Sequence, residues 1–363
     1  MKKTNPFKAS LVAVVLGILI GFFAVWITGR NPYNMFVALF RSMTGFNLAK
    51  PGSQPNIMFV LNWFLETLPI ILTGLSVAFA FRTGLFNIGG EGQYFVGSTA
   101  AAFVALAIKL PPIIHPIVSL LAGMLAGAIW GFLPGFLKAY RKVNEVVICI
   151  MLNYVGWYFS AWFVRSFLPI DPNTNARTID FQKTAIFGTL GFGTSSQFNW
   201  SFIVVIICLI IYHILIEKTT FGYSLRATGF NSEAARYAGM KTKRNIVYSM
   251  MISGAFSGAA GAITILGVYK YGRIFTGFDN YGFDGISVAL VGAVNSVGII
   301  FSGLLFGLLK ACSNNLQLFN IPKEISEIIQ SIIIFIVAIQ YIITWYENKV
   351  AMKKKEVLTD GNN

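Results

Sequence analysis

The chain has 363 residues, of which 55% are hydrophobic and 12% are charged, and its mean hydropathy is +0.67. Soluble domains carry about 25% charged residues, so this composition excludes an ordinary soluble domain and indicates an integral membrane protein. The formal net charge of +14 would suit nucleic-acid binding, but basic residues of membrane proteins collect in cytoplasmic loops, so topology has to be considered first.

Ten apolar segments follow one another along the chain and predict an all-α, polytopic membrane protein with about ten transmembrane helices. They are about 9–28, 58–81, 92–109, 117–137, 144–164, 200–216, 246–268, 285–299, 300–316 and 326–345. The first segment follows a basic start but is too long for the apolar region of a cleavable signal, so we expect an uncleaved span. The eighth and ninth segments form one apolar stretch that is interrupted near Asn295.

The basic residues are distributed unevenly between alternate loops. With the N-terminus inside, the cytoplasmic side receives the basic runs 138–142, 217–245 and 347–356. The outer segments carry fewer and more scattered cations; they are 29–57, 165–199 and 269–284. This orientation satisfies the positive-inside rule and predicts cytoplasmic N- and C-termini. The net positive charge then follows from the preference for basic residues in cytoplasmic loops, and it requires no nucleic-acid partner.

Two groups of four spans, the second to fifth and the seventh to tenth, begin on opposite sides of the membrane in this topology. Each group has a Gly-rich polar loop after its first span, TGLFNIGGEGQ from Thr83 and TGFDNYGFDGIS from Thr276. The pattern predicts an inverted repeat, and transporters place substrate sites between such repeats.

The stretch LFNIGGEGQYF, residues 85–95, places a flexible acidic loop between two apolar segments. Irregular backbone at membrane depth occurs where it lines a cavity or is buried in protein, and a carboxylate there faces the interior. We therefore predict that this break lines a solute path. The candidate residues are Asn87, Glu91 and Gln93 for hydrogen bonding and Phe86 and Tyr94 for stacking. The alternative is structural: Glu91 pairs with Arg82, and the rings serve packing.

Two further polar residues within apolar spans are candidates for the same path. Glu66 precedes Pro69 in the second span and either lines the path or meets water near the outer third of the membrane. Asn153 lies deep in the fifth span, where its alternative role is a hydrogen bond between helices. Asn144 and Glu145, at the inner end of that span, favour gating or subunit contact.

The longest cytoplasmic segment, 217–245, contains a short helix with its own caps. Asn231 suits an N-cap, Glu233 falls in the first turn where negative charge is favourable, and Gly239 suits the C′ position. The alanines of this helix form a small-residue surface; they are Ala234, Ala235 and Ala238. A helix this short is unstable alone, and a helix lying on a membrane carries large apolar residues, so docking on a protein is favoured over docking on lipid headgroups.

Residues 222–240, GYSLRATGFNSEAARYAGM, resemble the cytoplasmic coupling segment of ABC import permeases of the branched-chain amino acid, ribose and nucleoside class. The matching residues are Gly222, Leu225, Arg226, Ala227, Gly229, Asn231, Ala234, Ala235, Gly239 and Met240. The stretch NIGGEGQ, together with NEVV and MLNY between 144 and 154, is most similar to the nucleoside and simple-sugar permeases. The resemblance covers nearly the whole chain past residue 58.

In that class the coupling segment fits a groove on an ATP-hydrolysing subunit. The resemblance therefore assigns ATPase coupling to Gly222, Arg226, Asn231, Glu233, Ala234, Ala235 and Gly239. It implies three parts of the chain: a tail, first span and outer loop over 1–57, a permease core over 58–346, and a basic cytoplasmic tail over 347–363.

The resemblance also implies partners. We expect a plasma-membrane permease that binds no cofactor or metal itself, with ATP and Mg²⁺ held by a separate ATPase chain, because the sequence contains no P-loop, nucleophile motif or metal cluster. An extracellular binding protein would deliver a nucleoside, and a second homologous permease chain would complete a heterodimeric pore. The alternatives are a simple sugar or a branched-chain amino acid as cargo, or an ion-coupled carrier that uses Glu66 and Glu91.

Overall fold

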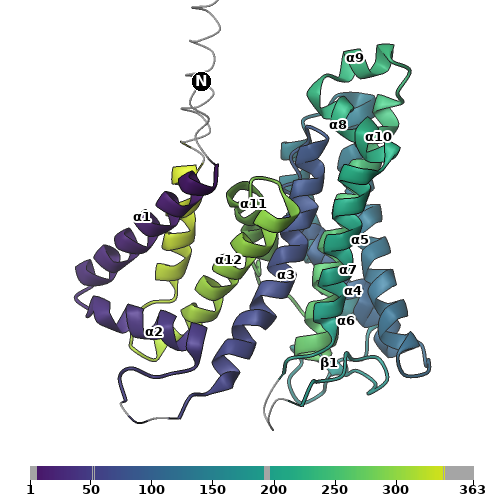
Figure 1. Cartoon of the computed structure of the whole chain (residues 1–363). Helices are drawn as coiled ribbons and strands as arrows, with labels where there is room; N and C mark the ends of the chain where they lie inside the picture. Colours follow the sequence, from purple (N-terminus) through teal and green to yellow (C-terminus); the bar gives the residue numbers. More distant parts are fainter. Residues whose placement is uncertain (1–5, 51, 53, 192–196, 338, 340–363) are drawn as a thin grey trace, which may run out of the picture. The chain divides into compact units, whose positions relative to one another are not determined.

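The computed structural model describes residues 6–50, 52, 54–191, 197–337 and 339. In chain order the elements are α1 (Pro6–Ile27), α2 (Pro32–Thr44), α3 (Ile57–Arg82), α4 (Gly90–Ala107), α5 (Ile114–Arg141), α6 (Glu145–Phe167), β1 (Arg177–Asp180), α7 (Ser201–His213), η1 (Ile214–Lys218), α8 (Thr220–Phe230), α9 (Ser232–Tyr237), α10 (Thr242–Ile263), η2 (Thr264–Tyr269), β2 (Tyr271–Arg273), α11 (Tyr281–Val291) and α12 (Ser296–Gln317) (Figure 1). Residues 324–337 form a further helix. The described chain is mostly helical, which confirms the predicted class.

Six helices among the described residues are long and apolar enough to cross a membrane. They are Ile57–Arg82, Ile114–Arg141, Glu145–Phe167, Ser201–Lys218, Thr242–Tyr269 and Ser296–Gln317. Two shorter apolar helices, Val12–Ile27 and Tyr281–Val291, accompany them. The protein is thus a multi-pass membrane protein, whereas the count of ten spans stays a prediction.

The structure corrects the eighth predicted span, 285–299. In its place α11 has 11 residues, about 16 Å, and ends at Val291, which is too short for a bilayer crossing. The interruption lies where the sequence predicted it, because Asn295 Oδ1 accepts a hydrogen bond from the Val297 N–H at 3.1 Å at the start of α12. Helices α2 and α8, inside segments that were predicted as loops, are additions to the predicted elements.

A small antiparallel sheet of β1 and β2 is also absent from the predicted all-α fold. Thr178 Oγ1 accepts a hydrogen bond from the Gly272 N–H at 2.8 Å and ties the two strands together. Beside this sheet, Asp171 accepts from the Asn173 N–H at 3.0 Å and from Arg177 Nε at 3.3 Å. These contacts lower the pKa of Asp171 from its ordinary value.

The chain forms two compact units, one of residues 1–38 with 313–363 and one of residues 39–312. In the first unit, α1 lies against the helix at 324–337, since a methyl group at Gly17 would come within 2.5 Å of Ile333. The expected boundaries at 57 and 346 stay predictions, and residues 347–363 lie outside the described part.

The second unit is built around α10, which packs on α3, α4 and α5. Glycines allow these helices to approach closely: a methyl group at Gly97 would lie 2.4 Å from Gly258 Cα, and one at Gly127 would lie 2.3 Å from Gly254 O. In contrast, α5 and α6 expose large apolar side chains such as Leu125 and Met151. Those exposed faces suit contact with lipid.

Candidate functional site

Two short loops with one residue pattern precede α4 and α11. Loop A, residues 83–89, leads from α3 into α4, and loop B, residues 276–280, leads from β2 toward α11. Both follow the pattern T-G-x-x-N-x-G-x-[D/E]-G, which continues into the first turn of the next helix. The equivalent residues are Thr83 and Thr276, Gly84 and Gly277, Asn87 and Asn280, Gly89 and Gly282, Glu91 and Asp284, and Gly92 and Gly285.

Glu91 joins the beginnings of the two helices. Its side chain is fully buried, and its carboxylate accepts hydrogen bonds from the N–H groups of Asn280 at 2.8 Å and Gly282 at 2.6 Å. The first N–H groups of a helix have no partner within the helix and favour a negative charge, so Glu91 caps α11 from α4. The alternative pairing of Glu91 with Arg82 is wrong, because Arg82 forms its ion pair with Glu217.

Asn87 and Gln93 face a buried hydrogen-bond network between α3, α4 and α10. Asn87 Nδ2 donates to Gln93 Oε1 at 2.8 Å and to Ser253 Oγ at 2.7 Å. The Asn87 Oδ1 atom accepts from the Gly89 N–H at 3.0 Å, which shapes loop A, and Ser76 and Ser257 continue the network. A network with its polar groups satisfied rigidifies the contact between helices.

Three more predicted residues surround loop A. The Asn153 side chain accepts from the Gly92 N–H at 2.8 Å and donates to Ile88 O at 2.9 Å, the interhelical contact named above as its alternative role. Tyr94 is fully buried, and its hydroxyl donates to Asp279 at 3.2 Å. Phe86 is partly exposed and stacks on Phe81 with ring centroids 5.2 Å apart.

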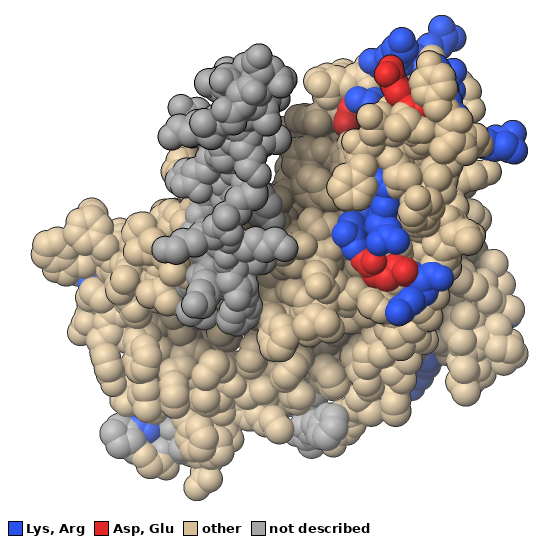
Figure 2. Space-filling view, turned by 45° about the horizontal axis from the view of Figure 1, so that its top comes forward, with Lys and Arg blue, Asp and Glu red and all other residues tan. Residues whose placement is uncertain are grey.

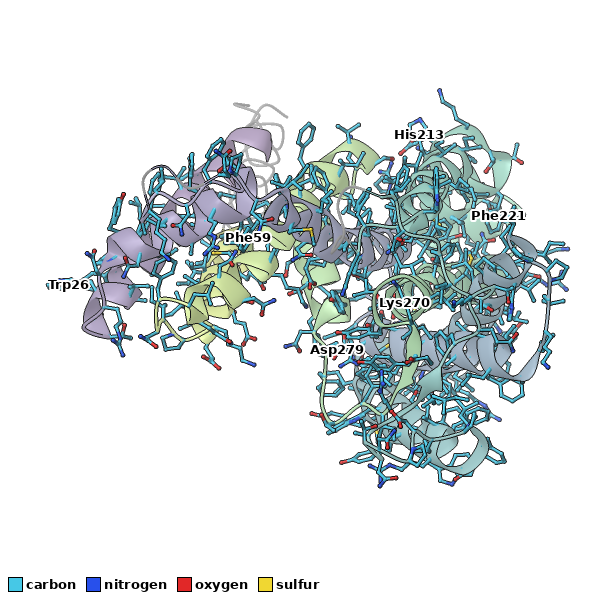
Figure 3. All side chains as sticks on the ribbon, turned by 90° about the horizontal axis from the view of Figure 1, so that it is seen from below. Trp26, Phe59, His213, Phe221, Lys270 and Asp279 are labelled. Carbon is cyan, nitrogen blue, oxygen red and sulfur yellow. The ribbon has the colours of Figure 1, made fainter. Side chains whose placement is uncertain are left out.

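Around loop B the sequence analysis missed a cluster of charged residues. Arg273 binds Asp279 through both terminal nitrogens, at 2.5 and 3.1 Å. Burial lowers the pKa of Arg273, but the Asp279 carboxylate outweighs this and the pKa is raised, so the guanidinium stays charged. Figure 3 labels Asp279 in the segment that leads into α11.

Lys310 and Glu66 complete this cluster. Lys310 Nζ donates to Asp284 Oδ2 and to Asp279 O, both at 2.9 Å, and lies 3.8 Å from the centre of the Tyr281 ring. The Tyr281 hydroxyl donates to Glu66 Oε2 at 2.7 Å. Two sequence features could have identified the cluster: a single lysine inside an apolar span, and the equivalence of Asp284 with Glu91.

Residues 217–245, called the coupling segment below after their predicted role, fold locally as the predicted caps require. Asn231 Oδ1 accepts from the N–H groups of Glu233 and Ala234, both at 3.0 Å, and α9 begins at Ser232. Gly239 has φ +81°, the left-handed conformation expected at C′. The proposed alanine surface needs a correction, because Ala235 is buried at 3% exposure whereas Ala234 is exposed.

The coupling segment also contacts loop A. Glu217 lies between Arg82, with which it forms an ion pair, and Arg226, whose Nη1 donates to it at 2.8 Å. At the end of α8, a methyl group at Gly84 would lie 3.0 Å from Gly229 Cα, so the two backbones touch. Gly222 permits a similar approach to Leu215 at the start of α8. A displacement of α8 would therefore also displace loop A.

Residues 59–338 match the family described as "Branched-chain amino acid transport system / permease component". The chain belongs to this permease family. The prediction of a permease subunit without its own ATPase site is thereby confirmed, because the family comprises the permease components of such systems.

Two relatives of the permease cover nearly its full length, and a third covers about three quarters of it. It is 36% identical over 356 residues to the guanosine ABC transporter permease protein NupP of Bacillus subtilis, covering 98% of this chain and 99% of the relative. It is 33% identical over 349 residues to the nucleoside ABC transporter permease protein NupB of Lactococcus lactis, covering 94% and 93%. A more distant relative, at 28% identity over 280 residues covering 74% and 73%, is the glucose ABC transporter permease protein TsgB13 of Haloferax volcanii.

Proposed function

We propose that this permease carries nucleosides across the plasma membrane as one subunit of an ATP-driven importer. The observation that carries the proposal is the 36% identity over 98% of the chain to a guanosine ABC transporter permease. The second nucleoside relative supports the same class of cargo.

An ATPase chain that binds ATP and Mg²⁺ would dock on α8 and α9. Phe230 at the end of α8 is 90% exposed and Tyr237 at the end of α9 is 86% exposed. Exposed Lys and Arg side chains lie in α9 and around the beginning of α10; they are Arg236, Lys241, Lys243 and Arg244. Figure 2 shows Lys and Arg side chains gathered at this end of the molecule. This end of the chain is cytoplasmic in the predicted orientation, with both termini on the same side. The two aromatic side chains replace the alanines as the centre of the proposed contact.

Two further partners belong to the proposal. A second, homologous permease chain would form a heterodimeric pore with this one, and an extracellular binding protein would release the nucleoside at the end that carries the β1–β2 sheet. We further propose that loop A and the beginning of α11 form a gate between the predicted inverted repeats, because Glu91, Asn87, Gln93 and Asn153 hold the interrupted helices together.

Uptake in cells tests this function. Labelled guanosine, uridine, ribose, glucose and leucine would be supplied to cells that lack this chain, with and without its restored expression, while ATP and membrane potential are collapsed separately. We expect nucleoside uptake to depend on the chain and on ATP. Chain-dependent glucose or ribose uptake would instead support the sugar alternative, which the glucose relative motivates. Uptake that follows the membrane potential would indicate an ion-coupled carrier.

The docking surface needs a separate test. Tyr237→Ala and Phe230→Ala should reduce co-purification of the ATPase and lower uptake by roughly 10-fold, as expected for an aromatic residue at the centre of an interface. Tyr33→Ala, which alters an exposed tyrosine elsewhere, is the control. Normal ATPase binding by both variants would move the docking surface away from α8 and α9.

A further inference from the structure

Three carboxylates lie within the described spanning helices, and one of them, Glu66, forms no ion pair with a described residue, although Lys310 lies close enough to interact with it electrostatically. Glu145 pairs with Lys138 at 2.7 Å, and Glu217 pairs with Arg82 and Arg226. In contrast, the one hydrogen bond that Glu66 receives from described residues comes from the Tyr281 hydroxyl, at 2.7 Å to Oε2. Its Oε1 atom therefore accepts no hydrogen bond from the described part of the protein.

Glu66 lies well inside its helix. Helix α3 begins at Ile57 and ends at Arg82. At 1.5 Å per residue, Glu66 lies about 14 Å along the helix axis from the beginning of α3 and about 24 Å from its end. Its side chain is partly exposed. A carboxylate at such depth is costly against lipid and faces water or protein instead. The face of α3 that carries Glu66 is therefore turned to a water-filled path or to another subunit.

One neighbouring residue adds a second polar side chain to this face, and others hold Glu66 in place. Asn62, one helical turn before Glu66, is exposed. Trp63 Nε1 donates to Leu304 O at 2.7 Å and so ties this part of α3 to α12. Tyr281 is itself held, because Lys310 Nζ lies 3.8 Å from its ring centre and is anchored on Asp284 at 2.9 Å. The Glu66 carboxylate thus has a fixed orientation.

A carboxylate with one oxygen occupied and one open is an acceptor for hydroxyl groups. The ribose of a nucleoside carries neighbouring 2′ and 3′ hydroxyls, and a carboxylate is a common acceptor for the ribose 2′-OH in proteins. Hydrogen bonds to an ionised acceptor are stronger than neutral ones. We propose that Glu66, oriented by Tyr281, accepts hydrogen bonds from the ribose hydroxyls of the solute as it passes this part of the path. This inference rests on the proposed nucleoside function and assigns it a ribose contact.

Transport of two solutes by the complete transporter tests the proposal. The transporter with its ATPase, partner permease and binding protein is placed in vesicles, and ATP-dependent uptake of guanosine and 2′-deoxyguanosine is measured. The same binding protein serves every variant, and it can prefer one solute over the other. Dividing the uptake rate of each variant by the parent rate for the same solute cancels this preference of the binding protein. Glu66→Ala should lower guanosine uptake roughly 10-fold or more and 2′-deoxyguanosine uptake several-fold less. Glu66→Gln, which keeps a neutral acceptor, should lie between.

Tyr281→Phe is the second variant, because it leaves Glu66 in place and removes its orienting hydroxyl. It should also reduce guanosine uptake more than 2′-deoxyguanosine uptake, by a smaller factor. Glu324→Gln, at an exposed carboxylate, is the matched control and should change neither rate. The amount of assembled complex is measured for each variant. If the Glu66 variants fail to fold, the uptake rates of Tyr281→Phe test the proposal instead.

Equal losses for the two solutes in the assembled variants, or no loss for either, would overturn the ribose contact and make Glu66 structural. Failure of the parent transporter to take up any nucleoside would instead contradict the proposed function. The two failures are therefore distinguishable in one experiment.

Discussion

Loop A and loop B share one residue pattern and differ in what surrounds them. Asn87 in loop A is fully buried and bonded to neutral side chains, whereas its equivalent Asn280 in loop B is exposed. Glu91 after loop A accepts from backbone N–H groups, whereas the equivalent Asp284 pairs with Lys310. The same residue pattern thus forms a neutral, buried contact between helices at loop A and a charged, partly exposed surface at loop B.

This difference predicts that equivalent substitutions at loop A and loop B have different effects on the protein. At loop A every polar group has a partner within the helix packing, and loop A also touches the coupling segment. At loop B the charged side chains pair with one another, and the neighbouring Tyr281 binds Glu66, the proposed ribose contact. We therefore expect substitution of the buried polar side chains at loop A to lower stability, and substitution of Glu66 beside loop B to lower transport.

Glu91→Ala should have the largest effect. It leaves the partly buried N–H group of Asn280 and the buried N–H group of Gly282 without their acceptor. An unpaired buried group costs about 1–3 kcal/mol, so the loss for the two groups is at most roughly 2–6 kcal/mol. The measurement is the thermal midpoint and the yield of the assembled transporter in detergent. A variant with parent stability and yield would show that α4 and α11 do not depend on this cap.

Asp284→Ala should come next, and it should be repairable. Removing one partner of a buried pair leaves Lys310 uncompensated and costs about 3–5 kcal/mol, reduced here because the lysine side chain is 21% exposed and also bonds Asp279 O. Asp284→Ala combined with Lys310→Met should recover most of the lost thermal stability. An unrepaired double variant would indicate that the two residues do not act as a pair.

The equivalent asparagines give a third, direct comparison. Asn87→Ala removes hydrogen bonds to Gln93, Ser253 and the Gly89 N–H, with an expected loss of about 1–3 kcal/mol. The Asn280 side chain forms no hydrogen bond with a described residue, and Asn280→Gly relieves a φ of +66°, so stability should change by less than about 0.5 kcal/mol. Thermal midpoints of the two variants decide the matter, and equal losses would remove the contrast between the loops.

The sequence predicted the local features of the fold because their causes are local. Asn231 and Gly239 encode the caps of α9 in their own side chains and backbone freedom, and Asn295 interrupts an apolar stretch. The burial of Asn87 could not be predicted, because a polar residue in a membrane loop has the same sequence signature whether it faces a path or the hydroxyl of Ser253.

The partners of Glu91 and Glu66 were unpredictable for a different reason. Glu91 binds two backbone N–H groups, which every non-proline residue possesses, so no letter of the sequence marks them. Glu66 binds Tyr281, which lies 215 residues away along the chain. The β1–β2 sheet was missed because strands of four and three residues are too short to show an alternating pattern.

The smallest expected effect separates Gly84 in loop A from Gly277 in loop B. Gly84 has φ +73°, and a methyl group there would lie 3.0 Å from Gly229 of the coupling segment, whereas a methyl group at Gly277 would meet no atom within 4 Å. Gly84→Ala should therefore cost about 1–2 kcal/mol and lower the number of nucleosides carried per ATP hydrolysed, because α8 and loop A no longer fit together. Gly277→Ala should leave both quantities near the parent value.

The two variants add the same methyl group at equivalent positions of loop A and loop B. If only Gly84→Ala lowers the number of nucleosides carried per ATP hydrolysed, the loss is traced to the contact between loop A and α8. Equal numbers in both variants would contradict a mechanical link through loop A.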